Sequence, residues 1–318
     1  PPCWLGNPHA QTLVARSLRS PVGNRYHRRR IETPDGDFLD LDFDRDVDAF
    51  RNAPRGQVLL VHGLEGCSRS GYILNTIRYL REAGYGCVAM NMRSCSGEPN
   101  RLPRFYHSGD TRDLSTVLSH LEELGITGPL RAVGFSLGGN QVLKYLGEHG
   151  EDAPLACALA VSVPFDLSAG ADHLHQGFGR LYEKYFLYRL KHKILRKQRY
   201  RNHGLDLSDL PRIRTLRSFD ERFTAPLHGF ESAEEYYRRS SCTQYLEDVE
   251  VPTLILQARD DPFLPEECLP EREIADNPWL RGLFTERGGH VGFLRNPSSL
   301  KPTFWAEETI VDFLNHTR

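Results

Sequence analysis

Short runs of apolar and β-branched residues alternate with amphipathic segments along most of the chain. The apolar runs predict strands at 57–62, 86–91, 130–135, 157–163, 253–258 and 280–285. The segments with apolar residues on one helical face predict helices at 72–82, 111–124, 141–147 and 303–314. Strands separated by helices imply βαβ crossovers, so the pattern predicts an α/β fold with a mostly parallel sheet and helices on both faces.

Two segments depart from this alternation. Residues 26–32 and 38–43, joined by the turn Thr33-Pro34-Asp35-Gly36, predict an antiparallel hairpin at one edge of the sheet. Residues 165–245 show no strand pattern and are charged, aromatic and helical. Because the alternation resumes afterwards, we interpret this stretch as a helical insertion within one domain that spans residues 1–318.

The composition is that of a globular protein with a sizeable core: 318 residues, of which 39% are hydrophobic and 26% charged. Forty Lys and Arg against 42 Asp and Glu give a net charge of −2, which argues against nucleic acid as a partner. We expect no membrane span, since no apolar run approaches ~18–20 residues. We also expect no secretory signal, since no basic segment followed by an apolar one stands at the start of the sequence. The seven cysteines form no Cys-x-x-Cys pair, so we expect reduced thiols in a cytoplasmic protein.

Gly134-Phe135-Ser136-Leu137-Gly138 fits a Gly-x-Ser-x-Gly pattern between a predicted strand and a predicted helix. This setting is typical of a nucleophile elbow, in which a sharp turn exposes a reactive serine. The glycines fit that geometry because a tight turn leaves no room for a Cβ atom two residues before or after the serine. The alternative is a turn with an incidental serine, but the context favours Ser136 as a nucleophile.

A serine hydroxyl becomes a nucleophile only when a base takes its proton, so an acid and then a histidine should follow, each after a strand. Asp260 and Asp261 end one predicted strand, and His290 follows the next one within a glycine-rich loop. The carboxyl ends of parallel strands meet at one sheet edge, so these side chains can converge on Ser136. His290 is the predicted base, and either aspartate can supply the acid.

The oxyanion of an acyl-transfer reaction needs backbone N–H donors. Leu137 is one candidate because its N–H directly follows the serine at a helix N-terminus. Leu64 is the other because it lies in the loop after the first parallel strand, where Gly63 lets the backbone turn. In the same loop, we interpret His62 as a bracing histidine and Glu65 as a salt-bridged residue rather than as catalytic groups.

Together these motifs resemble the α/β-hydrolase superfamily, and within it the YheT/EMB8-like branch that includes the ABHD1/2/3-type proteins. The resemblance covers nearly the whole chain and includes His9-x-Gln11-Thr12, His62 to Gly66, Asn91-x-Arg93-x-Cys95-Ser96-Gly97, Tyr106 to Gly109, Gly134 to Asn140, Phe219-Asp220, Tyr236-Tyr237 and Asp260-Asp261-Pro262-Phe263. It implies an eight-stranded sheet and a Ser136–His290–Asp261 triad, with Asp260 as a loop-capping carboxylate. It also implies hydrolysis of carboxylic esters, with acylglycerols or other short-to-medium acyl esters as substrates.

The insertion lies where this superfamily places a lid. Phe165, Phe178 and Phe186 are candidate substrate-binding residues that would line an apolar acyl pocket; the alternative is that such aromatics only join the lid to the core. Residues 180–201 predict a basic helix, which is either a surface for transient contact with anionic lipid or a solvated helix face. Its basic residues are Lys184, Arg189, Lys191, Lys193, Arg196, Lys197 and Arg199.

We therefore expect a serine hydrolase that cleaves carboxylic esters of apolar acyl groups through an acyl-enzyme, with a small-molecule ester as its partner. We expect no cofactor and no metal, since His173 and His175 lack a third ligand at a suitable spacing. A thioesterase or acyltransferase with the same triad is an alternative. A ligand-binding protein with vestigial turnover is another, although a complete triad argues against it.

Overall fold

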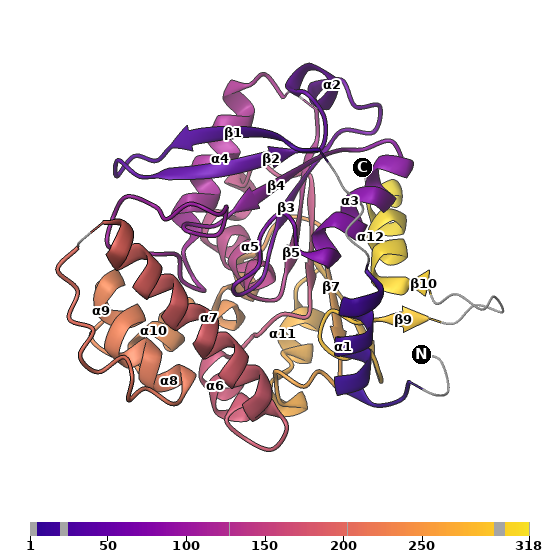
Figure 1. Cartoon of the computed structure of the whole chain (residues 1–318). Helices are drawn as coiled ribbons and strands as arrows, with labels where there is room; N and C mark the ends of the chain where they lie inside the picture. Colours follow the sequence, from indigo (N-terminus) through magenta and orange to yellow (C-terminus); the bar gives the residue numbers. More distant parts are fainter. Residues whose placement is uncertain (1–4, 20–24, 127, 202, 296–302, 318) are drawn as a thin grey trace.

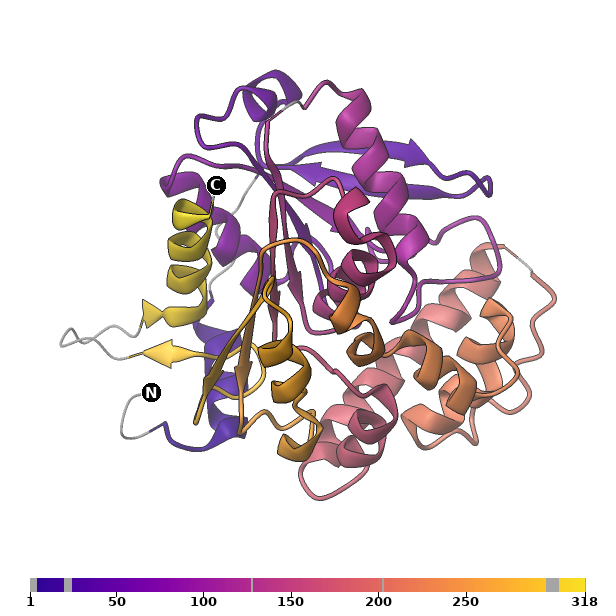
Figure 2. The same ribbon diagram turned by 180° about the vertical axis from the view of Figure 1, so that it is seen from behind.

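A single eight-stranded sheet forms the centre of the molecule in the computed structural model, with strand order β1-β2-β4-β3-β5-β6-β7-β8 (Figures 1 and 2). The structure describes residues 5–19, 25–126, 128–201, 203–295 and 303–317. The strands are β1 (His27–Glu32), β2 (Phe38–Phe43), β3 (Gln57–Val61), β4 (Gly86–Asn91), β5 (Leu130–Phe135), β6 (Cys157–Val161), β7 (Thr253–Ala258) and β8 (Leu280–Thr285). β2 pairs antiparallel with β1 and β4, and all other neighbours are parallel. The predicted α/β class and antiparallel edge are confirmed.

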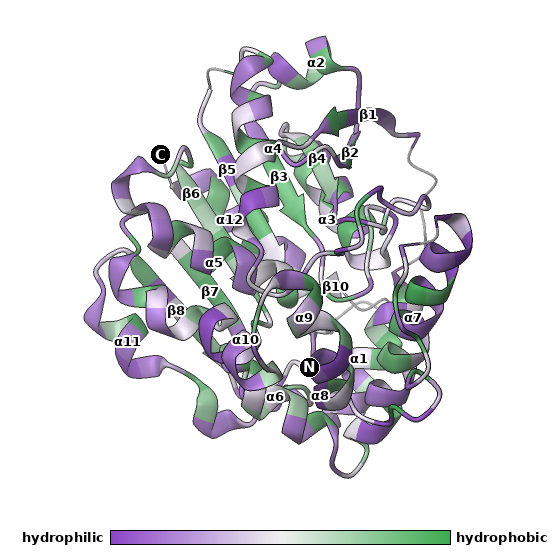
Figure 3. Ribbon diagram, turned by 90° about the vertical axis from the view of Figure 1, so that its left-hand side faces the viewer, coloured by the Kyte–Doolittle hydropathy of each residue, from purple (hydrophilic) through white to green (hydrophobic). Residues whose placement is uncertain are grey.

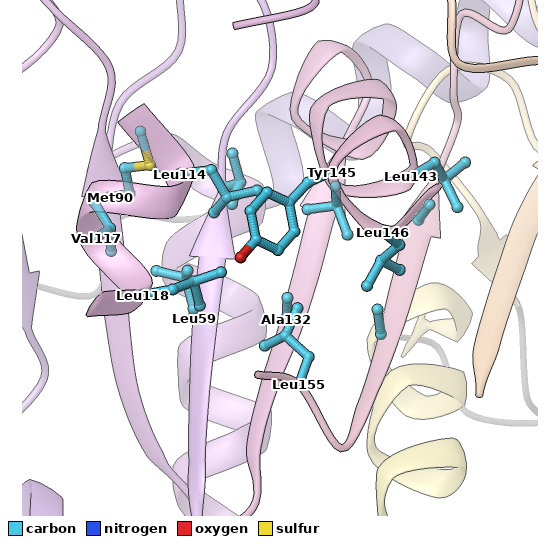
Figure 4. Packing of buried hydrophobic residues seen from close by; sticks show 14 of the residues in the cluster. Leu59, Met90, Leu114, Val117, Leu118, Ala132, Leu143, Tyr145, Leu146 and Leu155 are labelled. Carbon is cyan, nitrogen blue, oxygen red and sulfur yellow. The ribbon is translucent and has the colours of Figure 1, made fainter. Parts of the chain in front are cut away.

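Helices cover both faces of this sheet. The α-helices outside the insertion are α1 (Pro8–Leu18), α2 (Val47–Arg51), α3 (Gly71–Glu82), α4 (Thr111–Glu123), α5 (Leu137–His149), α11 (Glu271–Asp276) and α12 (Trp305–His316). Along β3, Val58 and Leu60 pack with α3 and α12, whereas Leu59 and Val61 pack with α4 and α5. Figure 4 shows the apolar layer between the sheet and the helices α4 and α5, with Leu59 beside Leu118. Alternate side chains of β3 point to opposite faces of the sheet, and both sets are apolar. This pattern explains why the central strands are buried on both faces.

Hydropathy follows the same layering. In Figure 3 the central strands are predominantly green, whereas the surrounding helices alternate between green and purple segments. Burial of a leucine or valine side chain stabilises the fold by about 1.5–3 kcal/mol, so the two apolar layers supply most of the stabilising free energy. None of the helices in the described part of the chain combines the length and apolar character that a membrane span requires.

Two differences from the predicted helices matter for the site. α5 begins at Leu137, directly after Ser136, whereas the pattern predicted a start at residue 141. The Gly138-Gly139 pair, which lowers helix propensity, concealed its first turn. α1 was not predicted at all, although its start carries a recognisable signal: the Asn7 side chain accepts from Ala10 N–H at 3.0 Å and Pro8 is the first helical residue.

The insertion between β6 and β7 is helical, as the pattern indicated. It contains α6 (Leu167–Leu174), α7 (Gly179–Tyr200), α8 (Leu216–Phe219), the π-helical turn η2 (Asp220–Thr224), α9 (Ala225–His228), α10 (Ala233–Ser240) and the 3₁₀ segment η3 (Cys242–Asp248). Figures 1 and 2 show α6 to α10 as one group on one side of the molecule. Phe105, which precedes α4, joins a separate apolar cluster with residues of α7, such as Leu187 and Ile194.

A buried ion cluster fixes the loop that follows β4. Arg93 is almost completely buried, and its guanidinium donates to both carboxylate oxygens of Asp113 at 2.7 and 2.8 Å. It also contacts Asp37 at 3.0 Å and Asp35 at 3.0 Å. Hydrogen bonds from Thr33, Arg93 and Arg104 hold the pKa of Asp35 well below its usual range, against the opposing effect of burial. Arg93 therefore contacts three carboxylates, and Arg104 shares Asp35 and Asp113 with it.

We predict that Arg93→Ala lowers the free energy of unfolding by about 3–5 kcal/mol, because removing one member of a buried ion cluster leaves uncompensated charge in the interior. Urea unfolding followed by circular dichroism measures the change. Arg272→Ala is the matched control, since Arg272 is 89% exposed and pairs only at 3.5 Å with Asp276. Equal stability of the two variants would contradict this account of the cluster.

Candidate active site

A cavity lies between the ends of the central strands and the helices of the insertion. Its walls include Ser136, Asp261 and His290 from the strand ends, together with side chains of α6, α7, α8, η2, α9 and α10. Apolar residues make up much of the lining: Leu64, Phe105, Leu174, Phe186, Leu190, Ile194, Leu216, Phe219, Phe223, Leu227, Phe263 and Leu264. The cavity can therefore hold an apolar group beside polar side chains at the strand ends.

Ser136 occupies a sharp turn between β5 and α5. Its φ of 53° lies in the left-handed region, which side chains other than glycine rarely adopt. A Cβ atom on Gly134 would lie 2.4 Å from Gly138 O, and one on Gly138 would lie 2.4 Å from Val61 O. The two glycines are therefore sterically required, as the sequence pattern predicted.

The three residues predicted as a triad lie within hydrogen-bonding distance of one another. His290 Nε2 is 2.9 Å from Ser136 Oγ, and His290 Nδ1 is 2.9 Å from one Asp261 oxygen and 3.1 Å from the other. With Nδ1–H donating to the carboxylate, Nε2 is the acceptor for the serine hydroxyl. The Phe263 ring is stacked on the imidazole at a centroid distance of 3.9 Å and an interplanar angle of 10°, which restricts rotation of the ring.

The two adjacent aspartates have different partners. Asp261 contacts His290 and accepts from Phe263 N–H at 2.9 Å and Gln257 Nε2 at 3.2 Å. Asp260 instead accepts from the N–H groups of Gly288 and Gly289 at 2.8 and 2.9 Å. Burial raises the pKa of Asp260, although these two backbone donors oppose the shift. Asp260 is thus a loop-capping carboxylate by its contacts, and Asp261 is the one beside the imidazole.

The two predicted oxyanion donors both line the cavity. Leu137 is the first residue of α5, and Leu64 lies in the loop after β3. That loop approaches the serine closely, because a Cβ atom on Gly63 would lie 2.9 Å from Ser136 Cβ. The Gly63 N–H is itself occupied, since it donates to Tyr72 Oη at 2.9 Å.

His62 stabilises this loop through hydrogen bonds at both ring nitrogens. Its Nε2 accepts from Met92 N–H at 3.1 Å, so Nδ1 carries the proton and donates to Gly63 O at 2.8 Å. The side chain is completely buried, and burial lowers its pKa to about 4. His62 therefore joins the loops after β3 and β4 as a neutral imidazole, in agreement with its interpretation as a bracing residue.

Glu65 connects the same loop to α7. It adopts a φ of 55°, and its carboxylate pairs with Lys193 Nζ at 2.5 Å and accepts from Tyr106 Oη at 3.0 Å. Its backbone N–H lies 2.8 Å from Tyr106 Oη as well. Arg189 of α7 donates to Glu65 O at 3.0 Å. Glu65 is therefore salt-bridged, as expected, and it ties the candidate oxyanion loop to the insertion.

Of the three aromatic residues predicted to bind substrate, Phe186 lines the cavity. Phe165 and Phe178 are not among the described residues of its walls. Phe165 is completely buried in the main apolar core. Phe178 is 44% exposed and packs on the His9 ring at 4.3 Å.

The structure divides the basic side chains of α7 into two sets. Some contact protein groups: Lys193 pairs with Glu65, Lys191 donates to Ile213 O at 2.7 Å, and Lys197 donates to Asn100 Oδ1 at 2.6 Å. Others are exposed on the outer face, namely Arg180, Lys184, Arg196 and Arg199, although Arg180 donates to His175 O at 2.9 Å and Arg196 donates to Gly97 O. The helix is therefore not uniformly a solvated basic surface.

The contribution of α1 was missed by sequence reasoning. Thr12 Oγ1 accepts the backbone N–H of His290 at 2.9 Å, and a Cβ atom on Gly289 would lie 2.7 Å from the same oxygen. After α1, Arg19 donates to Val291 O at 2.6 Å and pairs with buried Glu307 at 2.8 Å. The residues around Thr12 belong to a motif in the resemblance, which was the only signal for this role.

Comparison with known proteins identifies the family. The alpha/beta hydrolase fold family matches residues 56–297. Escherichia coli (strain K12) YheT is 39% identical, over 98% of this chain and 91% of its own length. Phospholipase ABHD3 of Mus musculus is 34% identical, over 92% of this chain and 72% of its own length. The solved Pyrococcus furiosus esterase Pf2001 shares the fold, with a TM-score of 0.59 at 17% identity over 92% of this chain and 93% of that chain.

The chain therefore belongs to the alpha/beta hydrolase family, and to its YheT/ABHD-type branch. This assignment confirms the resemblance drawn from the motifs. Within the described residues, no cluster of three or more His, Cys, Asp or Glu side chains is arranged to hold a metal ion.

We predict that His62 stays neutral down to about pH 4, well below its ordinary value of 6.5. Proton NMR of the imidazole signals measures the midpoint, with a His62→Gln variant to assign the resonance. Because the folded pKa is depressed, His62 stabilises the fold above about pH 6.5, and this contribution is lost as the pH falls toward 4. A midpoint between 6 and 7 would show that the bracing contacts are absent in solution.

Proposed function

We propose that this protein is a serine hydrolase that cleaves carboxylic esters of apolar acyl groups through an acyl-enzyme. The observation that carries the proposal is the 2.9 Å contact between Ser136 Oγ and His290 Nε2, with Asp261 on the opposite ring nitrogen. The apolar walls of the cavity support an acyl group as the bound moiety. The name of the mouse relative, a phospholipase, supports lipid esters as the substrate class.

In the first step, His290 Nε2 takes the proton of Ser136, and the serine oxygen attacks the ester carbonyl carbon. The carbonyl π electrons move onto the oxygen, where the N–H groups of Leu64 and Leu137 stabilise the negative charge. Asp261 fixes the imidazole tautomer and stabilises the imidazolium that forms. When the tetrahedral intermediate collapses, the imidazolium gives its proton to the leaving alcohol, and the acyl group remains on Ser136.

In the second step, His290 takes a proton from water, which attacks the acyl carbon. The same backbone donors stabilise the second oxyanion, and the imidazolium returns a proton to Ser136 as the carboxylic acid leaves. A thiol ester or an alcohol acceptor would use the same groups. Wild-type turnover of acyl-CoA, and acyl transfer to added glycerol, therefore separate a thioesterase or an acyltransferase from an ester hydrolase.

We predict that Ser136→Ala lowers kcat/KM for a p-nitrophenyl acyl ester by at least about 10³-fold and abolishes labelling by a fluorophosphonate, because the nucleophile is gone. Ser17→Ala is the matched control, since Ser17 is exposed on α1 and its hydroxyl donates only to Leu13 O. Undiminished turnover by Ser136→Ala would eliminate the mechanism. Labelling without ester turnover would instead favour the ligand-binding alternative.

We further propose that the outer face of α7 makes transient contact with an anionic lipid surface. Leu181, Tyr188 and Leu195 are 55, 68 and 41% exposed at seven-residue spacing, among the exposed basic residues of this helix. Apolar side chains with flanking cations are the pattern of interfacial helices.

We predict that the protein co-sediments with vesicles containing phosphatidylserine more than with neutral phosphatidylcholine vesicles. Binding should fall several-fold in 0.5 M salt, where charges about 4 Å or more apart are screened. The double variant Leu181→Glu/Tyr188→Glu should lose this binding while keeping p-nitrophenyl ester turnover. Equal sedimentation of wild type and double variant would refute the contact.

A further inference from the structure

One row of polar side chains faces the largely apolar cavity from the insertion. The continuous helical segment α8–η2–α9 lines the cavity along two adjacent rows. The apolar row consists of Leu216, Phe219, Phe223 and Leu227. The polar row, at four-residue spacing, consists of Asp220, Thr224 and His228. A purely hydrocarbon acyl chain offers no hydrogen bond to the polar row, and buried polar groups cost free energy unless they are hydrogen-bonded. A pocket for such a chain therefore does not require this row.

Asp220 is the charged member of this row and begins the π-helical turn η2. Its two carboxylate oxygens accept from Thr224 Oγ1 at 2.6 Å and from Tyr237 Oη at 2.7 Å. A carboxylate has about four acceptor positions, so these two donors leave room for others. Short π-helical turns inside α-helices recur at functional sites, where they alter the direction of side chains.

The neighbouring polar groups support the same interpretation. Tyr236 Oη donates to Ser108 Oγ at 2.8 Å, and Tyr236, Tyr237 and Ser108 all line the cavity with Asp220. Arg217 lies over the Tyr237 ring at 5.1 Å but pairs with Asp172 and Glu234 at 2.9 and 3.0 Å. The donors that reach Asp220 are thus neutral hydroxyls, which leaves its charge only partly compensated.

We propose that Asp220, oriented by Tyr237 and Thr224, forms a polar subsite that binds a hydroxyl group of the ester substrate. The proposal rests on ester hydrolysis as the function and defines its substrate class more closely: an apolar acyl ester with a hydroxyl either on its alcohol part or on its acyl chain. A hydroxyl donating to a carboxylate is a charge-assisted hydrogen bond, stronger than one between neutral groups.

The test compares three esters of equal acyl length: the ethyl ester, the monoacylglycerol and an ω-hydroxyacyl ethyl ester. Wild-type kcat/KM should favour at least one hydroxylated ester over the plain ethyl ester by about tenfold, and Asp220→Asn should reduce this ratio to near one. Asp206→Asn is the matched control, because Asp206 is an exposed carboxylate of the same insertion that lies outside the cavity lining and pairs with Arg222. It should leave the ratio unchanged.

The outcomes distinguish failure of the proposed subsite from failure of the proposed ester hydrolysis. If Asp220→Asn loses the preference for the monoacylglycerol, the bound hydroxyl belongs to the alcohol part. If it loses the preference for the ω-hydroxyacyl ester, the bound hydroxyl belongs to the acyl chain. Equal wild-type rates on all three esters overturn the subsite alone, even if Asp220→Asn fails to fold, whereas no turnover of any ester contradicts the proposed function. Retention of the preference by folded Asp220→Asn also overturns the subsite.

The pH dependence of the ratio provides a second readout. Burial raises the pKa of Asp220 to about 6, with Thr224, Tyr237 and Arg217 opposing the shift. Tyr236 also faces this carboxylate, and burial raises the pKa of both tyrosines, so neither gains charge in this range. The preference should therefore decline as the pH falls through about 6, because the protonated carboxyl is a weaker acceptor. Groups shared by the substrates cancel in the ratio, and a ratio independent of pH between 5 and 8 would count against Asp220 as the acceptor.

Discussion

The hydrogen bond between Ser136 and His290 is the interaction on which the rest of this site depends, and it joins residues 154 positions apart. Its length is set by three loops at the ends of β5, β7 and β8, which are held in place by the parallel sheet. The sheet brings the loops together, but it does not fix the position of the imidazole. The side chains of Asp260, Thr12 and Arg19 hold the loop that carries His290 through hydrogen bonds to its backbone.

Backbone strain is concentrated around this hydrogen bond. Among the described residues, positive φ values occur outside glycine at Glu65, Ser94, Ser136, Ser162, Val291 and Phe293. Of these, Glu65, Ser136 and Ser162 line the cavity, and Val291 follows His290 directly. Each such conformation costs on the order of 1–3 kcal/mol, so the surrounding contacts must offset it. The Val291 N–H, for example, donates to Ser162 Oγ at 2.9 Å, which couples two of the strained positions.

The sequence was informative where a local pattern of apolar residues or glycines determines the structure. It was less informative where contacts between distant segments do so. The strands β3 to β7 were predictable because both faces of each are buried, whereas β8, at the sheet edge, is only partly buried. The elbow was predictable because Gly134 and Gly138 have a steric reason. The surroundings of Phe178 could not be predicted, because the contacts of an aromatic ring in the insertion depend on tertiary packing, here against His9 of α1. Asp260 and Asp261 could not be separated by their spacing, since their roles differ only through contacts with another loop.

The most direct test of the central claim is to trap the acyl group on Ser136. An acid-quenched reaction with a p-nitrophenyl acyl ester, analysed by intact-protein and peptide mass spectrometry, should show the mass of one acyl group on the peptide that contains Ser136. The adduct should accumulate further in a His290→Gln variant acylated with a highly activated ester, because deacylation lacks its base. An acyl group found only on another residue, or ester turnover that continues after replacement of both Ser136 and His290, would contradict the account.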